Sequence, residues 1–283
     1  MDIKISIISD KINVYSKNIK VYTYILIVNE YLFVRNTVIC SHINNFMLYT
    51  HLILVTVIIA GILLSVLFKK LTWVAALTGG ILSFFIFKGA GFPGLLMLTI
   101  FFVTGVGVTS WQWDKKFRSG LAEKDKGRRK PGQVLANAGL PAVAGLMTYY
   151  CVYFEINAPL IIAACFASAT ADTVSSELGI IYGSRFYNIL NFKKSQRGLN
   201  GVISVEGTLL GVAGSSLIAL VYCAVYGWSL QAVTIIIAGT AGNIADSVMG
   251  ATLEKKGYLN NDVVNFLNTC AAALTVCLLK YVM

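Results

Sequence analysis

Long runs of apolar residues recur along this chain, separated by short polar segments. Eight of the runs are long enough to cross a hydrocarbon core of about 30 Å as a helix, which takes roughly 20 residues. They cover residues 50–68, 71–87, 92–111, 134–153, 158–181, 202–226, 229–250 and 263–282. The runs are continuously apolar rather than alternating, which argues against a transmembrane barrel. The pattern predicts an all-α fold, a polytopic transmembrane helical bundle of about eight spans.

The segment before the first run differs in its pattern of apolar and polar residues. An apolar stretch from Val21 to Cys40 is interrupted by polar and charged residues, so it is neither a clean signal peptide nor a clean span. Two interpretations stay open: translation that begins at Met47 after a mis-assigned start, or a ninth, marginal helix. We therefore divide the chain into an N-terminal segment of uncertain status, 1–46, and an integral membrane domain, 47–283.

Composition and the placement of charge indicate how the bundle is oriented. Hydrophobic residues make up 57% of the chain and charged residues 13%, with a mean hydropathy of +0.72, so lipid is the solvent for most of it. The net charge of +10 comes from basic residues in alternate loops, which favours a membrane topology signal over nucleic-acid binding. The basic loops contain Lys69 and Lys70, eight Lys and Arg between Lys115 and Lys130, four between Arg185 and Arg197, and Lys255 and Lys256. The positive-inside rule places these loops in the cytoplasm and predicts a multi-pass protein of the cell (inner) membrane.

Four acidic residues fall inside the predicted spans or at their edges. An Asp at the centre of a membrane helix costs about 2.5–3.5 kcal/mol, so each acid needs a reason to be there. With the topology above, Asp172, Glu177, Glu206 and Asp246 all come to the cytoplasmic side. Helix packing does not need a carboxylate, so we expect a functional role for Asp172 and Asp246, whereas the role of Glu206 stays open.

Small and polar residues also recur at helical spacing in the last four spans. Positions i, i+4, i+7 and i+11 lie on one face of a helix. The stripes are Ser168, Asp172, Ser175 and Gly179, then Ser204, Thr208, Gly211 and Ser215, then Gly239, Asn243, Asp246 and Gly250, and finally Asn261, Asn265 and Asn268. Four such faces are what a water-accessible cavity between helices requires. For Gly207, Gly211 and Gly214 the favoured role is close helix packing.

The residue types at this predicted cavity favour magnesium and phosphate chemistry. Carboxylates and amide oxygens suit Mg²⁺, which binds one or two carboxylates together with substrate phosphates. Lys193, Lys194 and Arg197 precede the pair Asn200–Gly201, and Arg128, Arg129 and Lys130 precede Gln133 and Asn137. As a set, these basic residues can hold a polyphosphate at the edge of the site. The chain has no Walker A sequence and no strand-linked G-x-G-x-x-G, so any nucleotide is bound by other means. The histidines and cysteines are not at zinc-ligand spacing.

Three segments, in order, resemble a known family. They are ATADTVSSELG at 169–179, RGLNGVISVEGTL at 197–209 and GNIADSVMGATL at 242–253, together with QVLAN at 133–137 and the pair Asn261 and Asn265. They are similar to domain-of-unknown-function family 92, which includes transmembrane protein 19 and the phytyl-phosphate kinases of chloroplasts and cyanobacteria. The resemblance extends over roughly 47–283 and leaves residues 1–46 outside it.

This resemblance implies a membrane enzyme that uses CTP to phosphorylate an isoprenyl monophosphate to its diphosphate, with Mg²⁺ as cofactor. It assigns catalysis and metal binding to Asp172, Glu177 and Asp246. Substrate or nucleotide binding is expected at Ser175, Ser176, Lys193, Lys194, Arg197, Asn200, Gly201, Ser204, Thr208, Asn243, Ser247, Asn261 and Asn265. The expected partners are membrane lipid, an isoprenoid phosphate and CTP, with no nucleic acid and an oligomeric state that the sequence does not specify.

Several alternatives stay open at this point. The lipid acceptor can be a monophosphate, which is already largely ionised at pH 7, or an alcohol, for which Asp172 would act as the base. Transfer of the cytidylyl group to a lipid phosphate uses the same residue types. A transporter or flippase is the third class, because acids inside the membrane also mark ion pathways. Clustering of the acids toward one membrane face favours the enzyme.

Overall fold

The computed structural model describes residues 47–150 and 157–282. The chain divides into two compact units, Met1–Val57 and Ile58–Met283, and the candidate site lies in the second. A first helix, Met47–Leu67, crosses the boundary between the units. The expectations for residues 1–46 fall outside the described residues.

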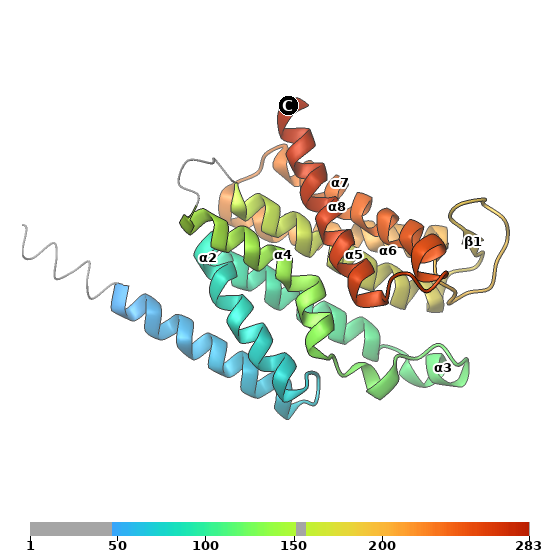
Figure 1. Ribbon diagram of the computed structural model, residues 1–283, viewed down its shortest axis with the longest axis horizontal. Coiled ribbons are helices and arrows are strands. Elements are labelled where there is room, and N and C mark those ends of the chain that lie inside the picture. Colours follow the sequence, from blue (N-terminus) through green and yellow to red (C-terminus); the bar gives the residue numbers. More distant parts are fainter. Residues whose placement is uncertain (1–46, 151–156, 283) are drawn as a thin grey trace, which may run out of the picture. The chain divides into compact units, whose positions relative to one another are not determined.

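The second unit is built almost entirely of helices (Figure 1). Its elements are α2 (Trp73–Ser110), α3 (Trp113–Arg118), η1 (Lys124–Gly127), α4 (Pro131–Tyr150), α5 (Ala158–Tyr182), β1 (Tyr187–Asn188), β2 (Val202–Ile203), α6 (Val205–Tyr226), α7 (Gln231–Met249), η2 (Gly250–Glu254) and α8 (Asn261–Val282). The two short strands pair antiparallel, with Tyr187 opposite Ile203. η2 is one turn of π-helix that continues α7.

The expectation of a polytopic membrane bundle is confirmed. Six helices in the described part of the chain are long and apolar enough to cross a membrane, and α4 adds a seventh long helix of 20 residues. α2 has 38 residues and two legs, because Gly91 leaves helical geometry (φ 60°, ψ −152°) two residues before Pro93. Counting both legs gives the eight segments that the apolar runs predict.

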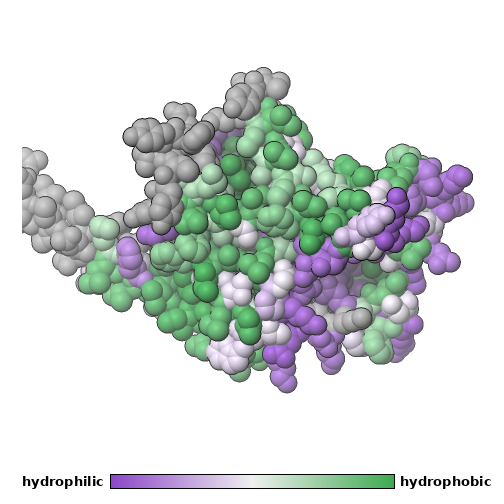
Figure 2. Space-filling view, in the orientation of Figure 1, coloured by the Kyte–Doolittle hydropathy of each residue, from purple (hydrophilic) through white to green (hydrophobic). Residues whose placement is uncertain are grey.

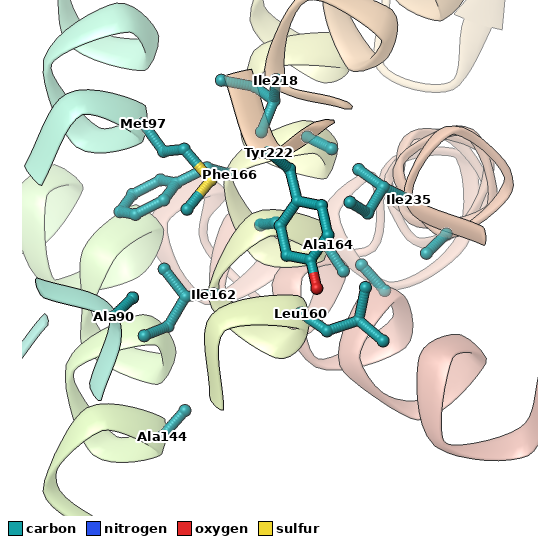
Figure 3. Packing of buried hydrophobic residues seen from close by; sticks show 14 of the residues in the cluster. Ala90, Met97, Ala144, Leu160, Ile162, Ala164, Phe166, Ile218, Tyr222 and Ile235 are labelled. Atoms are coloured by element: carbon teal, nitrogen blue, oxygen red, sulfur yellow. The ribbon is translucent and has the colours of Figure 1, made fainter. Parts of the chain in front are cut away.

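Helix α5 forms the centre of the bundle. In its most apolar stretch 72% of the residues are buried, against 39% or less in the other candidate spans, so protein rather than lipid surrounds it. Small side chains make this possible, because Ala163, Ala164 and Ala167 are fully buried and let neighbouring helices approach. Larger side chains such as Met97, Ile162 and Phe166 fill the space between helices (Figure 3). The Phe166 ring also stacks on that of Phe101, with 5.8 Å between the ring centroids.

The four basic segments meet at one end of the bundle, which we call the polar end; it carries α3, η1, the β1–β2 segment and η2. Each basic segment touches the next. Leu71 forms a β-bridge with Arg129, and the guanidinium of Arg197 donates to the Ser119 hydroxyl at 3.2 Å. The β1–β2 segment in turn lies against η2. In Figure 1, α3 and β1 lie at the same end, and Figure 2 shows hydrophilic residues gathered there.

Candidate functional site

A polar cavity of about 210 Å³ lies at the polar end, between α5, α6, α7 and the segment that joins β1 to β2. Ten residues that the sequence predicts for the site line it: Asp172, Ser175, Ser176, Asn200, Gly201, Ser204, Asn243, Asp246, Ser247 and Asn261. They come from three segments far apart in the sequence and from the start of α8. The polar helix faces therefore converge, as their spacing predicts.

Asp172 and Asp246 face each other across this cavity. Asp172 comes from α5 and Asp246 from α7, and their carboxyl groups are close enough to interact directly. Asn268 of α8 donates from Nδ2 to Oδ2 of Asp246 at 3.3 Å, and its own Oδ1 accepts from the Ser168 hydroxyl at 2.7 Å. Ser168 and Asn268 are both buried. This chain of hydrogen bonds fixes the position of Asp246 from two other helices.

Glu254 is a third acid at the cavity, and the sequence analysis did not assign it. Its carboxylate accepts a hydrogen bond from Asn200, and its charge acts on both Asp172 and Asp246. The helical spacing in the sequence could have indicated Glu254, because it follows Asn243, Asp246 and Gly250 on the same face of the helix. The expected span ended at residue 250, but the π-turn η2 continues the winding and brings Glu254 round to the cavity. Such turns are frequent at functional sites.

The segment after β1 closes one side of the cavity and leads into α6. Gly201 has a positive φ of 72° and lies directly against Ala251 of η2. The Ser204 hydroxyl then caps α6, accepting from the Gly207 backbone N–H at 3.1 Å. The 22-residue helix α6 thus begins at the cavity, and the positive end of its dipole there favours an anion.

Small residues pack α6 closely on α5, as the sequence predicts for three glycines. A side chain at Gly207, Gly211 or Gly214 would meet the α5 backbone within 3.0–3.2 Å. The resulting close approach brings the start of α6 next to Ser175 and Gly179. These glycines therefore position the cavity wall without lining it.

Glu177, by contrast, belongs to a separate buried ion pair. Its carboxylate pairs with the ammonium group of Lys116, which also donates to the backbone oxygens of Thr109 (2.7 Å) and Val108 (3.0 Å). Lys116 is only 2% exposed although it lies in the basic segment. The pair joins α3 to the end of α5, and the structure does not bring Glu177 to the cavity lining.

We expect replacement of Lys116 by methionine to lower the thermal unfolding temperature markedly, because Glu177 would be left buried without its cation. Breaking one side of a buried pair costs about 3–5 kcal/mol. Thermal unfolding in detergent should show a large loss for Lys116→Met and partial recovery in the double variant Lys116→Met/Glu177→Gln. Lys115→Met, at an exposed neighbour, is the matched control. The single variant Glu177→Gln completes the comparison. If the double variant lowers the unfolding temperature by the sum of the two single-variant losses, Lys116 and Glu177 are not directly coupled.

Arg129 is a second residue of interest, which the sequence indicates only as one member of a basic set. Its guanidinium lies over the Phe101 ring, 5.3 Å from the centroid, and fills the space beside Gly105. Loss of hydration on burial lowers the pKa of this guanidinium from its ordinary value, and nearby carboxylates, including Glu177 and Asp172, oppose the change. Within residues 47–150 and 157–282 no acceptor hydrogen-bonds to it. Arg129 therefore places a positive charge near enough to act on both Glu177 and Asp172.

Several predicted residues lie apart from the cavity lining: Glu177, Lys193, Lys194, Arg197, Thr208 and Asn265. The three basic ones are exposed in the segment between β1 and β2. The Thr208 hydroxyl donates to the Ser204 carbonyl at 3.0 Å, a bond within the helix. Glu206 is partly exposed, accepts from the backbone N–H of Ser184 at 3.2 Å and does not line the cavity. Glu206 is also absent from the polar stripe of Ser204, Thr208, Gly211 and Ser215, which agrees with this placement.

The donor set fits a magnesium ion held jointly by protein and substrate. Among the described residues, no group of three or more His, Cys, Asp or Glu side chains is arranged to hold a metal ion. Mg²⁺ does not need such a cage, because one or two carboxylates, several waters and substrate phosphates usually complete its shell. The paired carboxylates of Asp172 and Asp246, with the Asn243 amide beside them, match that requirement.

Comparisons with known proteins agree with this architecture. The family model of the integral membrane proteins DUF92 matches residues 55–273. The chloroplastic protein VTE6 of Arabidopsis thaliana is 30% identical over 251 residues, which cover 86% of this chain and 71% of the relative. An uncharacterized membrane protein of Methanocaldococcus jannaschii is 36% identical over 200 residues, covering 69% of this chain and 79% of the relative. No solved structure matches. The chain belongs to the DUF92 family of integral membrane proteins.

Proposed function

We propose that this protein is a membrane-embedded kinase that transfers a phosphoryl group from CTP to an isoprenyl monophosphate, giving the diphosphate and CDP. The observation that carries the proposal is the pair Asp172 and Asp246 facing each other in a polar cavity. The three sequence segments that resemble family 92, which includes phytyl-phosphate kinases, supply the lining of that same cavity.

The proposed transfer requires little covalent participation by protein side chains. An oxygen of the lipid monophosphate attacks the γ-phosphorus, the bond to the β–γ bridging oxygen breaks, and CDP leaves. At pH 7 the attacking phosphate is already largely ionised, so no general base is needed. Catalysis then rests on positioning and on stabilising charge around the transferring group.

Each part of the site has a role in this proposal. Asp172 and Asp246 would hold Mg²⁺, which when bound neutralises charge on the phosphates. The positive end of the α6 dipole would attract one phosphate, and the Gly201 segment would cover the reactants. Asn268 holds the Asp246 carboxylate in place. Glu254 and Asn200 form a polar contact at the rim.

The same proposal orients the protein in its membrane. Because the four basic segments meet at the polar end, the positive-inside rule puts that end, and the cavity, in the cytoplasm. CTP is then on the side where the cavity opens. An isoprenyl phosphate would approach from the bilayer with its phosphate at the same level.

The experiment that tests the proposal uses the purified full chain in lipid vesicles with Mg²⁺. Two parallel reactions contain γ-labelled or α-labelled CTP and a panel of isoprenyl monophosphates and the matching alcohols. Label from γ-CTP in an isoprenyl diphosphate is the expected result. Label from α-CTP in the lipid would instead identify a cytidylyltransferase. If folded protein incorporates neither label into lipid, the enzymatic proposal fails and transport is the function to test.

A further inference from the structure

A second cavity lies between α2, α4 and α8 and differs in character from the polar one. Its volume is about 500 Å³, and its lining is almost wholly apolar. Small residues of α4 form its floor, where Ala136 and Ala142 are buried and Gly139 has no side chain. Leu135 and Val143 stand on its rim with about half of their surface exposed, so this apolar groove opens sideways to lipid.

The groove follows α4 from its first turn deep into the membrane. Its lining begins at Gly132 and ends at Leu146, fourteen residues along the helix. At a rise of about 1.5 Å per residue this is a length of about 21 Å. The hydrocarbon core is about 30 Å thick, so the groove reaches past the bilayer midplane from the polar end.

The groove and the polar cavity approach each other at the start of α8. Asn261 lines the polar cavity, while its chain neighbours Asn260 and Asp262 line the mouth of the groove. A single ligand can therefore place a polar head in one and an apolar tail in the other. This continuity matches an amphiphile with one phosphate group and one long chain.

The dimensions of the groove indicate which kind of ligand it can hold. A helix is about 10 Å across, and one running the same 21 Å would displace more space than the groove contains. One extended hydrocarbon chain fits the space. The glycine and alanine floor leaves room for a chain that carries methyl branches.

We propose that the groove between α2, α4 and α8 binds the isoprenyl chain of the lipid substrate and sets the chain length that the enzyme accepts. This inference rests on the proposed function, because it takes the lipid phosphate as the acceptor in the polar cavity. The mouth of the groove receives the first isoprene units and Leu146 lies beside the last.

The test introduces bulky side chains at two depths of the groove. A side chain at Gly139 would begin 3.8 Å from Phe266 with no closer neighbour, so Gly139→Phe fills the groove without a backbone clash. We expect it to reduce kcat/KM for geranylgeranyl and phytyl phosphate by about tenfold or more, from the lost burial of several methylene groups, with little change for geranyl phosphate. Leu146→Trp should affect only the longest chains. Gly61→Phe is the matched control, because Gly61 is exposed in the first helix and has no neighbour within 4 Å of an added side chain.

A second measurement is independent of turnover. A photoreactive geranylgeranyl phosphate should crosslink to peptides of α4 and the first turns of α8, and unlabelled geranylgeranyl phosphate should compete while phosphatidic acid should not. Adducts elsewhere, equal competition by phosphatidic acid, or equal effects of Gly139→Phe on all chain lengths would overturn the groove assignment. If the wild-type protein phosphorylates no isoprenyl lipid yet crosslinks in the groove, the proposed reaction fails and the chain-binding site stands.

Discussion

Asp246→Asn and Asp172→Asn are each expected to reduce kcat for phosphoryl transfer by about a thousandfold, the scale on which removing preorganised electrostatic stabilisation acts. Each substitution removes one of the two carboxylates that face each other in the polar cavity. An amide keeps the shape of the side chain but loses its charge, so the metal-binding capacity falls while the fold is retained. Steady-state rates with labelled CTP, at saturating lipid phosphate, measure the effect.

The control for this prediction is Glu206→Gln, which changes a partly exposed acid two residues after Ser204 that lies outside the cavity lining. We expect less than about a twofold change for it, as for surface substitutions away from special features. Asn268 can still donate to the amide oxygen at position 246, so membrane insertion and thermal stability of Asp246→Asn should match those of the wild type. Full activity in both aspartate variants would eliminate the carboxylate pair as the catalytic centre.

Gly201→Ala is expected to produce the second large effect, a loss of activity of tenfold or more that is accompanied by a lower unfolding temperature. Two costs combine at this position. A left-handed φ of 72° costs a residue with a side chain about 1–2 kcal/mol. The added methyl group would also lie 2.6 Å from the backbone of Ala251, which forces the β1–β2 segment away from η2 and opens the cavity.

Gly257→Ala separates these two costs. Gly257 has a similar φ of 75° but nothing within 4 Å of an added side chain. This variant should show the backbone strain alone, with activity close to that of the wild type. The comparison needs the unfolding temperature and kcat of both variants side by side. Equal behaviour of the two would mean that contact between Gly201 and η2 is unimportant for the reaction.

The helices and the convergence of their polar faces could be predicted from the sequence because the membrane allows few alternatives. Apolar runs of sufficient length must be helical in lipid, and acids at helical spacing must face protein or water. Asp172, Asn243 and Asp246 follow directly from this reasoning. The DUF92 family match agrees with the motifs that carry these residues.

The other site features depend on contacts between distant segments, which spacing alone does not reveal. Lys116 is in a strongly basic loop, where a topological role is the ordinary interpretation, yet it is buried against Glu177. Glu254 reaches the cavity only because a π-turn prolongs α7 past the expected end of the span. The apolar groove needs three helices at once, and α4 gives no hint of it beyond its small residues.

The charge of the polar cavity has a consequence for which form of a nucleotide can enter. Among the described residues that line it, three are carboxylates and none is lysine or arginine. A bare triphosphate would meet electrostatic repulsion at the entrance, while a triphosphate already complexed with a divalent cation carries much less negative charge. If the cavity binds CTP as proposed, it would therefore select the ionic state of the nucleotide: the exposed basic residues outside would attract it, and the acidic interior would favour its metal complex over the bare triphosphate.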